Sequence, residues 1–213
     1  SQRTSPLRGS GPRIAFPPGL KAGIPCEDRG MAETFIAFLR AVNVGGRTVK
    51  MERLRELFGE LGLADVRTYI QSGNVFFTAD AGVDRAALTH RIEQHLEQAL
   101  GYPVPVMLRT VPEVEELLAG DPFQGIELTA DNRFCVVFLS EPLPADLELP
   151  RVTPRGDLEV IGATAGAAFV VGHIINGRPT GNPGDAFGKT YRGQGTSRFL
   201  HTTVKIVAAA KKG

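Results

Sequence analysis

Two short polar segments carry residue types from which an anion site could be built. The first is NVGG at residues 43–46, with Arg40 before it and Lys50 after it. Glycine adopts positive φ without strain, so Gly45 and Gly46 can expose successive backbone N–H groups near a helix start. Such a nest of N–H groups binds phosphate or carboxylate oxygens.

The second segment, QSGN at residues 71–74, interrupts a strand-like run, RTYIQSGNVFF. Together with Asn43, its side chains Gln71, Ser72 and Asn74 supply neutral donors and acceptors. Asparagine and glycine are also ordinary turn residues. The residues alone therefore leave two alternatives for these segments, a binding site and turns without a function.

No reaction can be read from the remaining chemistry, so whether the protein is an enzyme stays open. GDAFGKT at residues 184–190 resembles a phosphate loop, but three residues separate its glycines instead of four. No pair of carboxylates is marked out for acid–base work, and Ser72 has no histidine near it in sequence. The histidines stand at no metal-ligand spacing, so neither a metal site nor a cofactor is predicted.

Composition narrows the class of protein. The chain has 213 residues, enough for one or two domains, and no run of about 18 apolar residues that could cross a membrane. Its two cysteines, Cys26 and Cys135, are far apart and form no disulfide framework. This usage is typical of a reducing compartment and predicts a cytoplasmic protein without a membrane partner.

Charge is distributed unevenly along the chain. Residues 31–177 contain 12 basic and 20 acidic side chains, whereas residues 178–213 contain 7 basic and 1 acidic. An acidic body argues against binding to duplex DNA, which requires a basic face. The basic C-terminal segment either docks on the acidic body or receives an anion.

The first 31 residues differ from the rest. Residues 1–30 include five prolines and five glycines, a composition that does not support regular structure. A strand pattern begins directly after Met31. Residues 1–31 are therefore interpreted as a disordered leader or an overcalled start, with Met31 as the native start.

The pattern of residues 32–120 predicts a ferredoxin-like plait, β-α-β-β-α-β, within an α+β protein. TFIAFLR has apolar residues on both faces, as a central strand requires, and the proline-containing YPVPVMLR is confined to an edge. Asp84 and Gly101 are expected to cap the second helix. The predicted elements are strand 34–40, helix 51–61, strands 66–71 and 74–79, helix 85–100 and strand 102–109.

This topology places the two polar segments together. The first two strands run in the same direction, so the loop after the first and the turn after the second lie at one end of the sheet. A two-residue hairpin turn would pair Gln71 with Asn74. Residues 43–46 and 71–74 are therefore expected to be neighbours.

An alternative function uses the sheet face away from the helices. Tyr69 and Phe76 share that face and resemble the stacking aromatics of plaits that bind single-stranded RNA. Ile36 and Phe38 lie on the same face and favour its burial beneath the second half of the chain. An RNA-binding or protein-interaction module thus remains the alternative to a small-ligand site.

Residues 121–213 predict a second, looser α+β half. Strand patterns are followed by a glycine-rich stretch and a closing helix. One interpretation is a degenerate repeat of the first half, with each sheet covering the open face of the other. The predicted elements are strands 134–141, 157–163 and 167–175, the glycine-rich stretch 177–195 and the helix 201–212.

Several of these stretches resemble a known family. FLRAVNVGG, MERLRELFGELG, DVRTYIQSGNVFF, DPF and FLSEP are similar to the bacterial domain-of-unknown-function family 1697. The resemblance implies a bacterial, cytoplasmic, two-layer α/β protein built from plait-like repeats. It implies no activity.

The chain departs from the family pattern at two places. The family usually has glycine where this chain has Ala41. Near the C-terminus it usually has Arg-Asn-Trp before a helix that carries threonine and lysine. In SRFLHTTVKI, Arg198 and Lys205 match this pattern, whereas Phe199 and Leu200 replace asparagine and tryptophan. If that element completes a site in the family, this chain lacks two of its groups.

The sequence hypothesis is therefore a site for a small anionic ligand at the end of the sheet. The loop 41–50 and the turn 71–74 form it, and basic residues of the C-terminal segment join it. The predicted binding residues are Arg40, Asn43, Gly45, Gly46, Lys50, Gln71, Ser72, Asn74, Arg198 and Lys205.

Overall fold

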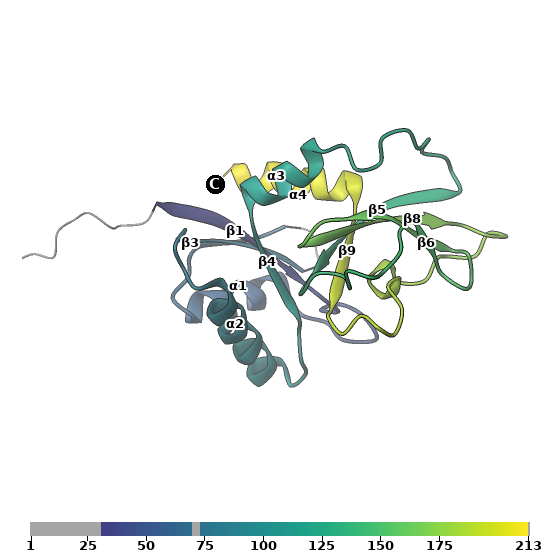
Figure 1. Cartoon of the computed structure of the whole chain (residues 1–213). Helices are drawn as coiled ribbons and strands as arrows, with labels where there is room; N and C mark the ends of the chain where they lie inside the picture. Colours follow the sequence, from purple (N-terminus) through teal and green to yellow (C-terminus); the bar gives the residue numbers. More distant parts are fainter. Residues whose placement is uncertain (1–30, 70–72, 213) are drawn as a thin grey trace, which may run out of the picture.

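The computed structural model describes residues 31–69 and 73–212. In this part of the chain it contains two antiparallel sheets and four α-helices, which confirms the predicted α+β class. The first sheet lies among the helices, and the second projects beyond them (Figure 1).

The first half has the strand order of a ferredoxin-like plait. Its order is β2-β3-β1-β4 with all neighbours antiparallel, so β1 is central and β4 is an edge strand, as predicted. Pro103 and Pro105 precede the edge strand instead of lying within it. The strands are β1 (Ala32–Leu39), β2 (Ala64–Thr68), β3 (Asn74–Asp80) and β4 (Val106–Thr110).

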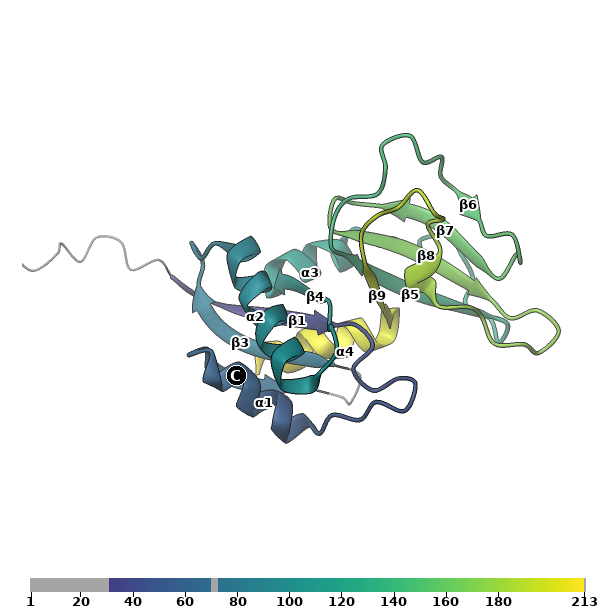
Figure 2. The same cartoon turned by 90° about the horizontal axis from the view of Figure 1, so that it is seen from below.

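Helices α1 (Met51–Glu60) and α2 (Arg85–Leu100) cover one face of this sheet (Figure 2). The Asp84 side chain accepts a hydrogen bond from the backbone of Ala87, and Gly101 ends α2 in the left-handed conformation, so both predicted caps are confirmed. The apolar stripes of both helices pack on one set of alternate strand residues.

The predicted pairing within the hairpin was wrong by two residues. Thr68 pairs with Val75, and the backbone N–H of Tyr69 donates to the carbonyl of Asn74 at 3.1 Å. The connection is longer than a two-residue turn because Asn74 is already engaged, its amide donating to the carbonyl of Tyr69 at 3.0 Å. A shift by two keeps every side chain on its predicted face. Gln71 lies outside the described residues.

The end of β1 and the start of β3 are neighbours, as the topology requires. The backbone N–H of Leu39 donates to the carbonyl of Gly73 at 2.9 Å. Gly73 has a φ of +84°, and a Cβ there would lie 3.1 Å from the Cβ of Leu39 and 3.3 Å from a methyl of Val42. Only glycine satisfies both the turn and this close approach.

The second half contains a five-stranded sheet with the order β6-β7-β8-β5-β9. Its edge strand β9 was not predicted, because GTSRF lacks an apolar alternation and follows the glycine-rich stretch directly. The elements are α3 (Val111–Ala119), β5 (Asn132–Leu139), β6 (Arg151–Val152), β7 (Leu158–Ala163), β8 (Ala167–His173), the short 3-10 helix η1 (Pro183–Asp185), β9 (Gly195–Phe199) and α4 (Leu200–Lys211).

The two sheets repeat one arrangement. Strands β7-β8-β5-β9 have the same order and directions as β2-β3-β1-β4, and α3 follows β4 as α4 follows β9. Where the first half has α1 and α2, the second half has long connections. Ala186 and Phe187 from one of these connections cover the outer face of the second sheet. The expected degenerate repeat is therefore visible in the strand order.

The inner faces of the two sheets share one core with α3 and α4, which lie side by side (Figure 1). Phe38 of β1 stacks on Phe138 of β5, with 3.8 Å between ring centroids. Phe76 belongs to the same core and is 1% exposed, whereas Tyr69 is half-buried. Phe76 is therefore not accessible for base stacking.

Candidate functional site

The end of β1 opens into a cavity between the two halves. This cavity has a volume of about 590 Å³. Residues 39–44 form one wall, and residues 195–198 of β9 form the opposite wall together with Asn182. The loop after the first strand, predicted to bind a ligand, therefore faces the second half of the chain and not only the turn at residues 71–74.

A second cavity of about 470 Å³ lies beside the first. The glycine-rich connection from Gly184 to Gln194 lines it, and Arg40 lines both cavities. We call the two cavities together the Arg40 cleft. Lys189 is the other basic side chain of the second cavity, and it is exposed.

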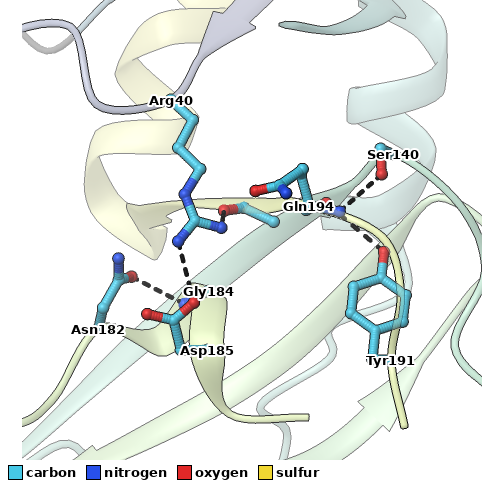
Figure 3. Close-up of polar contacts among 8 residues, drawn as sticks. Arg40, Ser140, Asn182, Gly184, Asp185, Tyr191 and Gln194 are labelled. Atoms are coloured by element: carbon cyan, nitrogen blue, oxygen red, sulfur yellow. Dashed lines mark hydrogen bonds and ion pairs between the residues drawn. The ribbon is translucent and has the colours of Figure 1, made fainter. Parts of the chain in front are cut away.

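Arg40 connects the two halves at this place. One guanidinium nitrogen donates to the carbonyl of Gly195 at 3.0 Å, and the other forms an ion pair with Asp185 at 2.9 Å (Figure 3). The side chain of Arg40 is 22% exposed, whereas that of Asp185 is 63% exposed. One nitrogen of Arg40 thus holds an exposed carboxylate at the cleft.

Short contacts hold the glycine-rich connection around the cleft (Figure 3). The side chain of Asn182 accepts from the backbone of Gly184 at 2.9 Å, and the Ser140 hydroxyl accepts from the backbone of Gln194 at 2.7 Å. The Tyr191 hydroxyl donates to the carbonyl of Glu141 at 2.7 Å. Burial raises the pKa of the Tyr191 hydroxyl, so it remains a donor at neutral pH.

Arg198, predicted to bind the ligand, forms the wall of the cleft and binds main-chain and side-chain oxygens. Its guanidinium donates to the carbonyls of Leu39 at 3.0 Å and Gly73 at 3.2 Å, and to the side chains of Asn74 at 2.9 Å and Thr196 at 2.8 Å. Burial lowers its pKa to about 10, still far above neutral pH. Arg198 and Asn74 thereby connect the two halves.

Both glycines of the predicted nest have positive φ. Gly45 and Gly46 have φ values of +64° and +83°, and open space surrounds both. Asn43 lines the Arg40 cleft and accepts from the backbone of Val49 at 2.8 Å, which closes the loop. Among the described residues, the glycine pair and the exposed Lys50 do not line the cleft.

The remaining predicted residues lie elsewhere. Lys205 is exposed on α4 and lines a separate groove. Gln71 and Ser72 fall outside the described residues. Within the described ranges, no group of three or more histidine, cysteine, aspartate or glutamate side chains could hold a metal ion, and no helix is long and apolar enough to span a membrane.

Asp185, the partner of Arg40, is not among the predicted residues. It lies in the GDAFGKT segment, which resembles a phosphate loop. It is the single acidic residue among residues 178–213, and this isolated negative charge was the available signal. No sequence pattern marks Ser140, Tyr191 or Gln194 as part of the site, because their contacts depend on the unpredicted strand β9.

Fold and cleft together define an α+β protein of two plait-like halves with a polar cavity at their junction. The chain belongs to the family described as Protein of unknown function (DUF1697), whose sequence model matches residues 32–169. The resemblance recognised in the sequence is thereby confirmed.

One solved structure shows the same fold. The conserved bacterial protein SP0830 from Streptococcus pneumoniae matches with a TM-score of 0.62 and 23% sequence identity, over 84% of this chain and 99% of that chain. At this identity the likeness concerns the fold alone. No curated protein matches the chain.

Proposed function

We propose that the Arg40 cleft binds a small anionic ligand. The observation that carries this proposal is the Arg40 guanidinium, which lines two adjoining cavities and already holds the carboxylate of a largely exposed aspartate. Asp185 occupies the position that a carboxylate or phosphate group of the ligand would take. The planar fork of arginine matches both groups.

Exchange of Asp185 for a ligand costs little. An exposed ion pair contributes about 0–1 kcal/mol, because water solvates both charges when the pair opens. Arg40 itself would stay in place through its bond to the carbonyl of Gly195. Lys189 supplies a second positive charge to the same cavity.

The neutral groups of the cleft define the rest of the ligand. Asn43, Asn182 and Ser197 line the first cavity and give it a neutral polar surface. A ligand with one acidic group and several hydroxyl or amide groups would complement both the basic and the neutral side chains of the cleft. Phosphorylated metabolites, nucleotides and hydroxycarboxylates belong to this class.

Isothermal titration with a panel of these anions tests the proposal. Asp185→Asn removes the competing carboxylate and is expected to tighten binding by about threefold to tenfold. Arg40→Gln is expected to weaken binding by about tenfold or more. Arg53→Gln, which removes an exposed arginine paired with Glu56 on α1, is the matched control and should change nothing.

Two results would overturn the proposal. One is the absence of binding to both the wild type and Asp185→Asn, the variant with the most open site. The other is binding that Arg40→Gln leaves unchanged while its melting temperature shows a folded protein. The interaction-module alternative would then take precedence.

A further inference from the structure

A separate recess lies where α4 begins. It has a volume of about 540 Å³. Three of its large apolar side chains are exposed to water, Leu128 by 64%, Phe199 by 45% and Val204 by 51%. Neighbouring residues of a strand point to opposite sides, so Phe199 faces away from the buried Arg198. We call this recess the α4 groove.

The charged side chains that line the α4 groove are all basic or able to become so. They are Arg133, His201 and Lys205. Arg133 is held in place by the carbonyls of Ala130 at 3.0 Å and Asn132 at 2.8 Å. The groove therefore combines an apolar floor with a cationic edge.

Two contacts define the shape of this edge. The ring of His201 stacks on Phe199, with 5.6 Å between centroids and 10° between planes, which fixes the orientation of the phenyl ring. Lys205 follows His201 by four residues and so lies on the same face of α4. Among the described residues Lys205 forms no ion pair.

We propose that the α4 groove binds an amphiphilic carboxylate, with a flat apolar body on Phe199 and its acidic group on Lys205. The volume lies within the range of about 300–1,000 Å³ that small-molecule sites occupy. Burial of the apolar body of the ligand against these side chains provides affinity. Charge complementarity selects the carboxylate, because an amine would meet three basic side chains.

This site is independent of the Arg40 cleft. The two recesses share β9, but none of the ligand contacts proposed for one involves a residue proposed for the other. A ligand of the α4 groove must be mainly apolar, whereas the Arg40 cleft has a more polar lining.

Calorimetric titration with naphthoate, and with uncharged naphthylmethanol for comparison, tests the proposal. We expect Lys205→Gln to weaken naphthoate binding about fivefold to tenfold and to leave naphthylmethanol binding within about twofold. Phe199→Ser should weaken both probes about tenfold. Fluorescence titration with anilinonaphthalene sulfonate gives a second readout for the same variants.

Two controls isolate the groove. Val152→Ser removes an exposed apolar side chain from β6, and Lys212→Gln removes a charge at the other end of α4. Both should bind naphthoate like the wild type. The proposal is overturned if the wild type does not bind naphthoate, or if Phe199→Ser and Lys205→Gln bind it as tightly as these controls do.

Discussion

Arg109 and Arg198 occupy equivalent positions in the two halves, and each binds carbonyl oxygens of the opposite half. Arg109 pairs across its sheet with Ile36 of β1, and Arg198 pairs with Val136 of β5. Each guanidinium also donates to the carbonyl of the residue before it in sequence. In both arginines the same atom, Nη1, donates this bond.

The acceptors that Arg109 and Arg198 contact across the junction are also equivalent. Arg109 donates to the carbonyls at the end of β5 and just before β8, on Leu139 and Gly166. Arg198 donates to the equivalent carbonyls of the first half, at the end of β1 and just before β3. The halves are thus held together by an exchange of arginines, and burial lowers the pKa of both guanidinium groups.

Loss of either arginine should destabilise the protein, and loss of Arg198 should cost more. Arg198→Met leaves several buried acceptors without a donor, and each costs about 1–3 kcal/mol. We expect a decrease of about 3–5 kcal/mol in the free energy of unfolding for Arg198→Met and about 2 kcal/mol for the half-buried Arg109→Met. Urea titration measures both, and Arg53→Met is the exposed control. Equal stability of Arg198→Met and the wild type would refute the exchange as a source of stability.

The stacked rings at the junction should be energetically coupled. Phe38 and Phe138 are fully buried and nearly parallel, at 9° between planes. In a double-mutant cycle with Phe38→Leu and Phe138→Leu, we expect a coupling energy of about 0.5–1.5 kcal/mol. Additive effects of the two substitutions would show that the rings contribute only their individual burial.

Ala41 should be replaced by glycine with a gain in stability. Its φ of +59° lies in the left-handed region, where an alanine Cβ is strained. We expect Ala41→Gly to raise the free energy of unfolding by about 0.5–1 kcal/mol. Ala208→Gly, at an exposed position within α4, should lower it by about 1 kcal/mol. A change of the same sign in the free energy of unfolding for both variants would contradict the argument that Ala41 is strained.

Stability should fall at alkaline pH through Cys135. Burial raises the pKa of this thiol from 9.0 to about 11. Between these values the unfolded chain has lost a proton that the folded chain retains, so the free energy of unfolding decreases as pH rises. Between about pH 8.5 and 10.5, we expect the free energy of unfolding of Cys135→Ala to fall by about 1–2 kcal/mol less than that of the wild type. Parallel pH profiles of variant and wild type would contradict this.

The first half of the fold could be predicted because its signals are local. The cap at Asp84, the stop at Gly101 and the two-sided apolar pattern of β1 each specify their own element. The predicted hairpin pairing assumed a two-residue turn and did not allow for the bond from the Asn74 amide to the carbonyl of Tyr69. The Asn74 side chain also accepts from Arg198, which is 124 residues away in the sequence.

The second half was less predictable for a physical reason. Where α1 and α2 stand in the first half, it has long connections without periodicity, and β9 is a short polar edge strand. Of the predicted binding residues, Arg40, Asn43 and Arg198 line the cleft. No local pattern could predict the strand β9 that carries Arg198, or the position of Asp185 beside Arg40.

The exchange of arginines has a consequence for how the chain acquires its structure. A fragment that ends near Gly120 would contain Arg109 without its acceptors, and the acceptors of Arg198 without their donor. Neither portion is complete by itself, so the whole molecule should melt in a single cooperative transition, and ribosomal synthesis must reach β9 before the N-terminal portion becomes resistant to proteolysis.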